Sequence, residues 1–382
     1  MIEDWMYLPV VNICCADENI WFSSMERNGL FKLDLSCGKI EYIGAFENAN
    51  FMGLHVFVFS YDNKIYFFNM YNDNVDNFRI VSINTETMEQ EGYWQFRHEK
   101  DHYPDIIQNK DRFIMIPENY SNPLVVLNLK KGKYEKINNW IAKQDIKNNT
   151  FGRLKLINNN YYGVIAHSNQ IVKINGETLK AELVVLGAKE FELNQLFADG
   201  DGFFVTGYQM DKLIEWRNGK IKYINLPGKN IDIGGGAISN KKLYLFPTYH
   251  LQDIIVYDIT TEKIHTLDLP ETLGIVDKRK EMPLFGTIKA SANKVIAPPW
   301  KANAFIVVDS ETDTVSCVSS KIGENATEDY LVNSIDLKNV VMESEYNPLT
   351  IFLKKIKANN IVAGNSQEKM QELIGSQMKD MG

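Results

Sequence analysis

Two histidines spaced four residues apart are the side chains whose types and spacing most clearly suggest a chemical role. His98-Glu99-Lys100-Asp101-His102 matches the H-E-x-x-H pattern, in which two histidines on one helix face bind zinc and the glutamate acts as a base. Both middle positions are charged and Pro104 follows two residues later, so the segment disfavours the helix that this chemistry requires. We therefore predict no metal site and no cofactor, with His98 and His102 as weak metal candidates.

A second group of candidate site residues lies in loops. The chain repeats a pattern of strands, and in nearly every repeat the loop after the second strand contains one of these residues. Each such loop carries an aromatic ring or a histidine, and rings that are not needed in a core are suited to recognition. The predicted ligand-binding residues of these loops are Tyr71, Tyr120, His167, Tyr208, Tyr249, His250 and Trp300. The competing interpretation is that the rings fold back as lids over the core.

Charged residues in the first strand of several units form a third group. If these strands surround a channel, Arg153, Lys289 and His55 would project into it and suit a small anionic ligand. Asp105 and Asn194 are expected beside them. The competing interpretation is a water-filled channel whose charges pair with one another.

Catalytic signatures are scarce. The chain has no G-x-S-x-G nucleophile elbow, no G-x-x-x-x-G-K-[ST] phosphate loop and no G-x-G-x-x-G dinucleotide fingerprint. The weak acid–base candidates are His167, His250, Glu118 and Tyr249. We expect a non-catalytic protein that binds a ligand or partner through the ring-bearing loops. The alternative at the same loops is a hydrolase or lyase acting on a glycan or a small molecule.

The elements that position these residues are repeated strands. Segments 19–22, 63–68, 111–115 and 241–246 are versions of one apolar strand entered from a polar turn, and a second strand follows each. A period of roughly 45 residues made only of strands and turns is typical of a β-propeller. Apolar runs without alternation indicate strands that are covered on both faces, as in blades stacked around an axis.

The pattern predicts an all-β fold, a seven-bladed β-propeller of four-stranded blades over residues 8–318. The blades are predicted at residues 8–43, 53–91, 103–137, 151–185, 191–225, 233–267 and 285–318. Closure is predicted to use either residues 10–15 as part of the last blade or the segment at 334–341.

In this blade pattern the chain resembles the kelch, WD-type and YncE-like propeller superfamilies. Gly234-Gly235-Gly236 falls in the first strand of one blade, whereas kelch repeats carry a double glycine after the second strand. The Gly-His and Trp-Asp signature of WD repeats is absent. The resemblance therefore implies an architecture and no functional residues.

The C-terminal part differs from the repeats. Residues 319–346 are predicted as a linker or closing segment, and residues 347–382 as a short helical extension that begins at Asn347-Pro348. These helices either dock on the propeller or make the protein a scaffold that forms homo-oligomers through them.

Composition limits the partners. The chain has 382 residues and a net charge of −8, which disfavours nucleic acid and anionic membranes. The N-terminus begins with acidic residues, and no apolar stretch approaches the roughly 18 residues of a membrane span. We expect a cytoplasmic protein without membrane insertion, whose partner is a protein segment or a glycan-bearing molecule.

Overall fold

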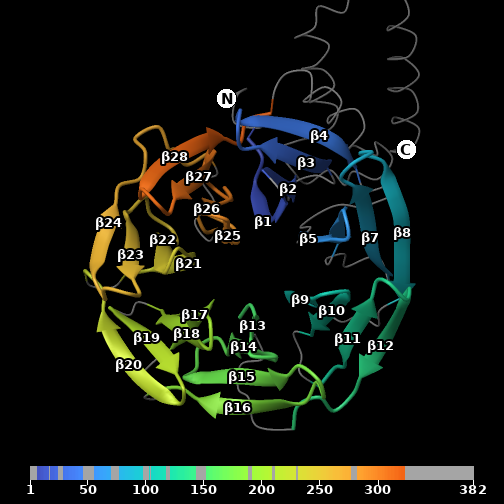
Figure 1. The fold of residues 1–382 in the computed structure, drawn as a ribbon, viewed down its shortest axis with the longest axis horizontal. Coiled ribbons are helices and arrows are strands. Elements are labelled where there is room, and N and C mark those ends of the chain that lie inside the picture. The colour runs from blue at the N-terminus through green and yellow to red at the C-terminus, as the bar shows by residue number, and fades with distance from the viewer. Residues whose placement is uncertain are drawn as a thin grey trace, which may run out of the picture.

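A computed structural model of the chain shows seven four-stranded antiparallel sheets arranged around a common axis (Figure 1). The structure describes residues 7–16, 18–24, 29–45, 56–69, 77–97, 103, 105–117, 121–142, 152–187, 192–208, 211–228, 231–276 and 282–322. The prediction of a seven-bladed β-propeller is confirmed. The predicted C-terminal helices, with the rest of residues 323–382, lie outside the described residues.

The blades follow one another along the chain, and each contributes four strands. Blade one contains β1 (Val10–Ala16), β2 (Asn19–Ser24), β3 (Gly29–Asp34) and β4 (Lys39–Ala45). Blade two contains β5 (Val56–Tyr61), β6 (Lys64–Asn69), β7 (Asn77–Asn84) and β8 (Gln90–Arg97). Blade three contains β9 (Asp105–Asn109), β10 (Arg112–Ile116), β11 (Leu124–Asn128) and β12 (Lys133–Ile137). Blade four contains β13 (Lys155–Ile157), β14 (Asn160–Val164), β15 (Gln170–Asn175) and β16 (Ala181–Val185).

The last three blades have the same construction. Blade five contains β17 (Leu193–Asp199), β18 (Gly202–Gly207), β19 (Lys212–Arg217) and β20 (Lys220–Asn225). Blade six contains β21 (Ile233–Ser239), β22 (Lys242–Pro247), β23 (Ile254–Asp258) and β24 (Ile264–Leu267). Blade seven contains β25 (Lys289–Ser291), β26 (Lys294–Ala297), β27 (Ala304–Asp309) and β28 (Thr314–Ser319). In every blade the first strand is innermost and the fourth outermost (Figure 1).

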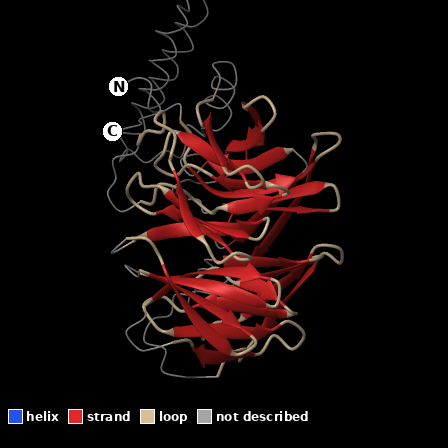
Figure 2. Ribbon diagram, turned by 60° about the vertical axis from the view of Figure 1, so that its left-hand side comes forward, coloured by secondary structure: helices blue, strands red, loops and turns tan. Residues whose placement is uncertain are grey.

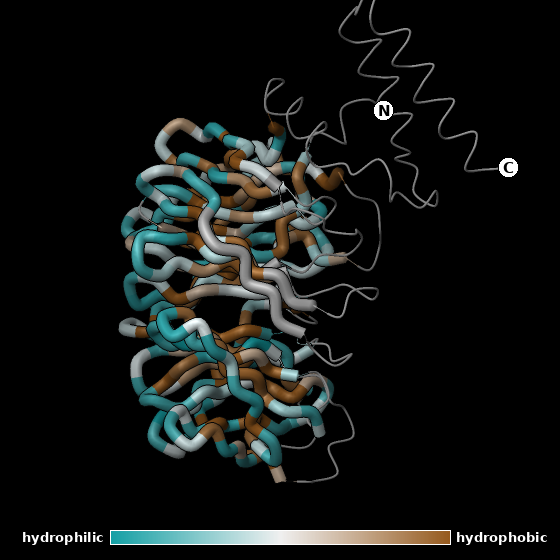
Figure 3. Tube along the Cα trace, turned by 90° about the vertical axis from the view of Figure 1, so that its right-hand side faces the viewer, coloured by the Kyte–Doolittle hydropathy of each residue, from teal (hydrophilic) through white to brown (hydrophobic). Residues whose placement is uncertain are grey.

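Apolar packing between neighbouring blades holds the ring together. Seven buried clusters fill the seven interfaces, one for each pair of adjacent blades. The second strand of a blade serves two of them: in β2, Phe22 packs toward blade seven and Trp21 toward blade two. This is why that strand is apolar on both faces in the sequence. Figure 3 shows hydrophobic segments inside the disc and hydrophilic residues at many of its turns.

Among the described strands, none is exchanged between blades where the ring closes. Residues 10–15 belong to β1, the innermost strand of blade one, so their predicted role as a strand of the last blade is wrong. Main-chain bonds join the two blades instead: the Leu8 N–H donates to the Ser320 carbonyl at 3.2 Å, and the Val10 N–H donates to the Pro299 carbonyl at 2.6 Å. The other predicted closing segment, 334–341, lies outside the described residues.

A glycine makes the close approach at this seam possible. A Cβ on Gly286 would overlap the carbonyl oxygens of Val10 and Val11, which are main-chain atoms and cannot rotate away. The equivalent Gly152 of blade four would likewise place a Cβ against Val164. Gly152 and Gly286 therefore both lie where an added Cβ would meet a neighbouring atom.

Two negative findings apply to the described ranges alone. They contain no helix with the length and apolar character needed to cross a membrane. They also contain no group of three or more His, Cys, Asp or Glu side chains placed to hold a metal ion.

Candidate functional site

The propeller presents two different faces (Figure 2). Every innermost strand enters from one face, and we call this the loop face because the connections between second and third strands and between blades lie there. The opposite side, where the remaining hairpin turns lie, is the turn face. Six predicted site residues lie outside the described residues: His55, Tyr71, His98, His102, Glu118 and Tyr120.

Three of the predicted loop residues come together on the loop face. His167 of blade four stacks on Tyr208 of blade five, with ring centroids 4.7 Å apart and planes within 8° of parallel. His167 Nδ1 lies 3.4 Å from the Glu192 carboxylate. Tyr249 of blade six is near enough for its charge to influence Tyr208, as are the carboxylates of Glu192 and Asp232. We call these five residues the ring cluster.

The backbone fixes the ring cluster at the point where one blade passes to the next. The Tyr208 N–H donates to the carbonyl of Glu192 at 2.8 Å, which ties the ring-bearing loop to the entry of the same blade. In the next blade, the Thr248 N–H and hydroxyl donate to the Asp232 carbonyl and carboxylate, each at 3.0 Å. His167 has a φ of 55°, a conformation that few residues other than glycine adopt without support.

Two carboxylates, those of Glu192 and Asp232, give the surroundings of Tyr208 a negative charge. Burial raises the pKa of the Tyr208 phenol, and the neighbouring Tyr249, Asp232 and Glu192 raise it further. Tyr208 therefore stays protonated at neutral pH, and its surroundings favour positive charge. Both tyrosines remain accessible, since Tyr208 is 38% exposed and Tyr249 is 40% exposed.

Other predicted loop residues lie apart from these contacts. His250 follows Tyr249 in the chain and is exposed to solvent. Trp300 is half-buried in blade seven, where its main-chain N–H donates to the Leu284 carbonyl at 2.9 Å. Trp140, which precedes blade four, is 1% exposed and its indole N–H donates to the Asn122 carbonyl at 2.8 Å. The Trp140 ring packs in the core cluster between blades three and four.

The charged residues predicted for the channel meet inside it. The Arg153 guanidinium donates to Asn12 Oδ1 at 2.9 Å, which connects blade four with blade one. The hydroxyl of Thr287, in blade seven, donates to the same oxygen at 2.6 Å. The Asp105 carboxylate accepts the Leu154 N–H at 2.7 Å.

This group contains one further cation that was not predicted from the sequence. Lys155 is the first residue of β13 and lies two residues after Arg153, which precedes the strand. Burial lowers the pKa of Lys155 to about 8, and the charges of Lys289 and Arg153 contribute to this shift. Burial and Arg153 also lower the pKa of Lys289. Burial raises the pKa of Asp105, against the Leu154 N–H and the three cations.

The channel group therefore contains three cations and one carboxylate. The exposed fractions of Arg153, Lys155 and Lys289 are intermediate, yet protein surrounds their charged ends. Both observations fit side chains that line a narrow passage. Asn194, also predicted for the channel, uses its amide to donate to the Ile233 carbonyl at 3.0 Å in the next blade.

Comparisons with known proteins identify the architecture. No protein-family model and no curated protein sequence matches the chain. A solved structure of streptogramin B lyase aligns with a TM-score of 0.58 at 14% identity, covering 78% of this chain and 92% of the lyase. Virginiamycin B lyase from Staphylococcus aureus aligns with a TM-score of 0.58 at 12% identity, covering 82% and 97%.

A third similar structure comes from a different functional class. The extracellular domain of a putative hybrid two-component system from B. thetaiotaomicron aligns with a TM-score of 0.54 at 12% identity, covering 79% of this chain and 40% of the other. At these identities the similarity shows the propeller fold alone.

Proposed function

We propose that this propeller is a non-catalytic binding protein that captures a protein segment at the ring cluster. The observation that carries the proposal is the stack of His167 on Tyr208, two rings from adjacent blades on the loop face. Stacked rings that are rigid and partly exposed supply contact area at a low entropic cost. The single rings of other blades lack this geometry among the described residues.

The charge of the ring cluster selects the kind of segment. Glu192, Asp232 and the π faces of Tyr208 and Tyr249 all attract positive charge. A lysine or arginine side chain would find an aromatic face and a carboxylate together. The proposed guest is therefore an extended peptide segment with at least one such side chain.

The test compares two classes of probe on the same protein. Immobilised peptides that carry a central Arg, Lys or Glu are measured by biolayer interferometry beside neutral oligosaccharides. We expect the Arg and Lys peptides to bind and the Glu peptides and oligosaccharides not to bind. Tyr208→Ala and Tyr249→Ala should each weaken binding by about fivefold, the value of one cation–π contact.

Tyr223→Ala is the matched control. Tyr223 lies on the outer strand β20 and is 46% exposed, so the change removes an equally accessible ring away from the loop face. Equal losses for Tyr223→Ala and Tyr208→Ala would contradict the proposal. Binding of the oligosaccharides alone would replace the protein segment by a glycan-bearing partner.

A lyase or hydrolase at the same position has one observation in its favour. His167 Nδ1 and the Glu192 carboxylate lie 3.4 Å apart, as in a histidine oriented by an acid for proton transfer. Mass spectrometry of a captured ligand after incubation with the protein separates the two functions. An unchanged ligand mass supports binding, and a cleaved ligand whose formation depends on His167 supports an enzyme.

A further inference from the structure

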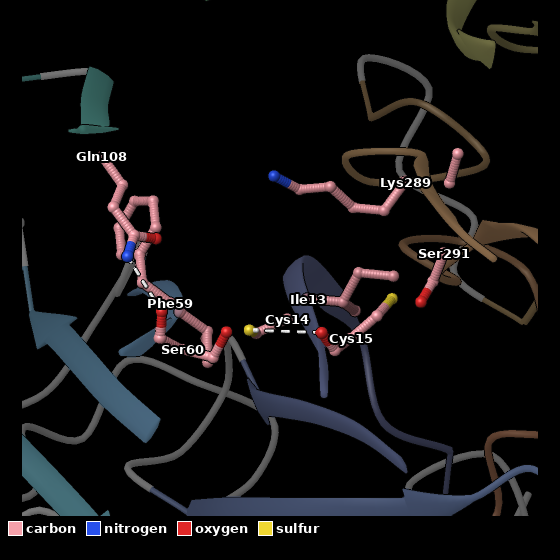
Figure 4. Close-up of a pocket in the computed structure, with 10 residues that line it drawn as sticks. Ile13, Cys14, Cys15, Phe59, Ser60, Gln108, Lys289 and Ser291 are labelled. Carbon is pink, nitrogen blue, oxygen red and sulfur yellow. Dashed lines mark hydrogen bonds between the residues drawn. The ribbon is translucent and has the colours of Figure 1, made fainter. Parts of the chain in front are cut away.

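A cavity of about 180 Å³ lies against the inner strands, toward the turn face. Its walls come from β1, β5, β9 and β25, and the late positions of Ser60, Gln108 and Ser291 in their strands place it at that end of the channel. Figure 4 shows the Lys289 side chain extending across the cavity from the side of Ser291 toward that of Gln108. The ring cluster, on the opposite face, shares no residue with this cavity.

Three side chains of the cavity wall can donate hydrogen bonds. The Lys289 ammonium and the hydroxyls of Ser60 and Ser291 can all donate to a bound group. The Gln108 amide already donates to the Ser60 carbonyl at 2.8 Å, which fixes that side of the wall. Ala290 and Val58 complete the lining with apolar surface.

The charges around the cavity do not balance. Lys289 is influenced by Arg153, and both lie in the group with Lys155 and Asp105 described above. Among the described residues, three basic groups outnumber the one carboxylate in this region of low solvent access. Uncompensated buried charge is costly, so the native state would be stabilised by an anion at this point.

We propose that the cavity is a binding site for a small oxyanion with two negative charges, held by Lys289 and the hydroxyls of Ser60 and Ser291. The volume of the cavity suits a small oxyanion, because 180 Å³ is the space of roughly six water molecules at about 30 Å³ each. A phosphate, a sulfate or a short dicarboxylate fits that space. Phosphate and dicarboxylate share the chemistry that the wall recognises, and the experiment distinguishes them.

The two thiols in the wall do not compete as nucleophiles or anions. Burial raises the pKa of Cys14, and burial with the neighbouring Cys14 raises the pKa of Cys15 to about 12. Both therefore stay neutral at pH 7. They therefore place no negative charge beside Lys289.

The experiment titrates the full chain with sodium phosphate, sulfate or malonate at constant ionic strength set with chloride, by calorimetry and thermal unfolding. We expect saturable binding of at least one dianion and a rise in melting temperature that follows the occupied fraction. Lys289→Met should weaken that binding by about tenfold or more, as expected for losing a charged hydrogen bond. The stronger of the phosphate and malonate arms identifies the ligand class.

Lys263→Met is the matched control, because Lys263 is exposed on the turn face and the change removes the same charge outside the channel. It should leave dianion binding unchanged. Equal effects of the two methionine variants, or no saturable binding to the wild type by any of the three dianions, would overturn the proposal. Ser291→Leu, which fills the cavity and keeps every charge, should also abolish binding, so retained binding in that variant would place the anion elsewhere.

Discussion

Arg153 and Asn12 lie 141 residues apart in the chain and are joined by a hydrogen bond of 2.9 Å from the guanidinium to Oδ1. The bond links the fourth blade to the first across the channel, since β1 and the start of blade four lie on opposite sides of the axis (Figure 1). Asn12 is 6% exposed and accepts from Thr287 through the same oxygen, while its amide nitrogen has no hydrogen-bond partner among the described residues. One small polar side chain thus supports a cation held away from water.

Substituting Asn12 tests this relationship. Asn12→Leu should lower the free energy of unfolding by about 2–3 kcal/mol, because it leaves the Arg153 guanidinium buried without its acceptor. Asn12→Asp has the same shape, replaces the unpaired donor by an oxygen and adds a negative charge opposite Arg153. We expect it to stabilise the protein at pH 7. Urea unfolding of both variants is the measurement, and two losses of equal size would contradict this account.

Lys155 gives the protein a specific dependence on pH. Its pKa is lowered to about 8 by burial and by the charges of Lys289 and Arg153, with Asp105 opposing the shift. The unfolded chain binds this proton more tightly, so stability due to Lys155 rises as pH increases from about 8 toward the ordinary value of 10.5.

Lys155→Met should therefore raise the melting temperature at pH 7, because it removes a desolvated charge and keeps the length of the side chain. The advantage over the wild type should shrink between pH 8 and 10, where the wild-type amine loses its own proton. Differential scanning fluorimetry across this range is the measurement. An advantage that does not change with pH would show that charge is not the cause.

The seam between blades one and seven depends on the missing side chain of Gly286. Gly286→Ala should lower the free energy of unfolding by about 1–3 kcal/mol, since the new Cβ would meet two main-chain oxygens of β1. Gly44→Ala is the control, because a Cβ added at this position on β4 would have no neighbouring atom within 4 Å. Guanidinium unfolding of the two variants should separate them, and similar stabilities would argue against a tight seam.

Asp313 joins blades six and seven and should make the protein sensitive to acid. It accepts hydrogen bonds from Tyr244 at 2.7 Å and Lys242 at 2.8 Å, and it lies 3.2 Å from His265. Burial alone would raise the pKa of Asp313, but the bonds from Lys242 and Tyr244 outweigh it and lower the pKa.

A carboxylate with a lowered pKa stabilises the folded state above its ordinary value of 3.8, and this contribution is lost as pH falls below that value. Asp313→Asn should lower the melting temperature at pH 7 and match the wild type more closely near pH 3. Glu271→Gln, at an exposed position, should have the melting temperature of the wild type at both pH values. If the difference in melting temperature between Asp313→Asn and the wild type became larger in acid, the stabilising role of the Asp313 carboxylate would be contradicted.

The fold was predictable because blade packing leaves a strong mark on the sequence. A strand such as β2 must be apolar on both faces to fill two interfaces, and such unbroken runs recur at a fixed spacing. Closure was not predictable, because the bonds from Leu8 and Val10 are made by main-chain atoms, which are the same for nearly every residue.

The candidate sites were predictable only in part. Lys155 could have been predicted, because it follows Arg153 at the same spacing at which the predicted Lys289 follows Thr287 in the last blade. The stacking of His167 on Tyr208 was not, since it depends on how two loops of adjacent blades approach each other. Asn12 carries no local signal, because its partner is far away in the chain.

The closure of the ring also decides how its chain can be rearranged. Each sheet is made from one continuous stretch of chain, and the Tyr7 and Lys321 backbones already pair as an isolated bridge. A circular permutant that links this pair and opens the chain in a connection between two other blades would keep all seven sheets whole. The N-terminus of such a permutant would then lie at the first strand of a different blade.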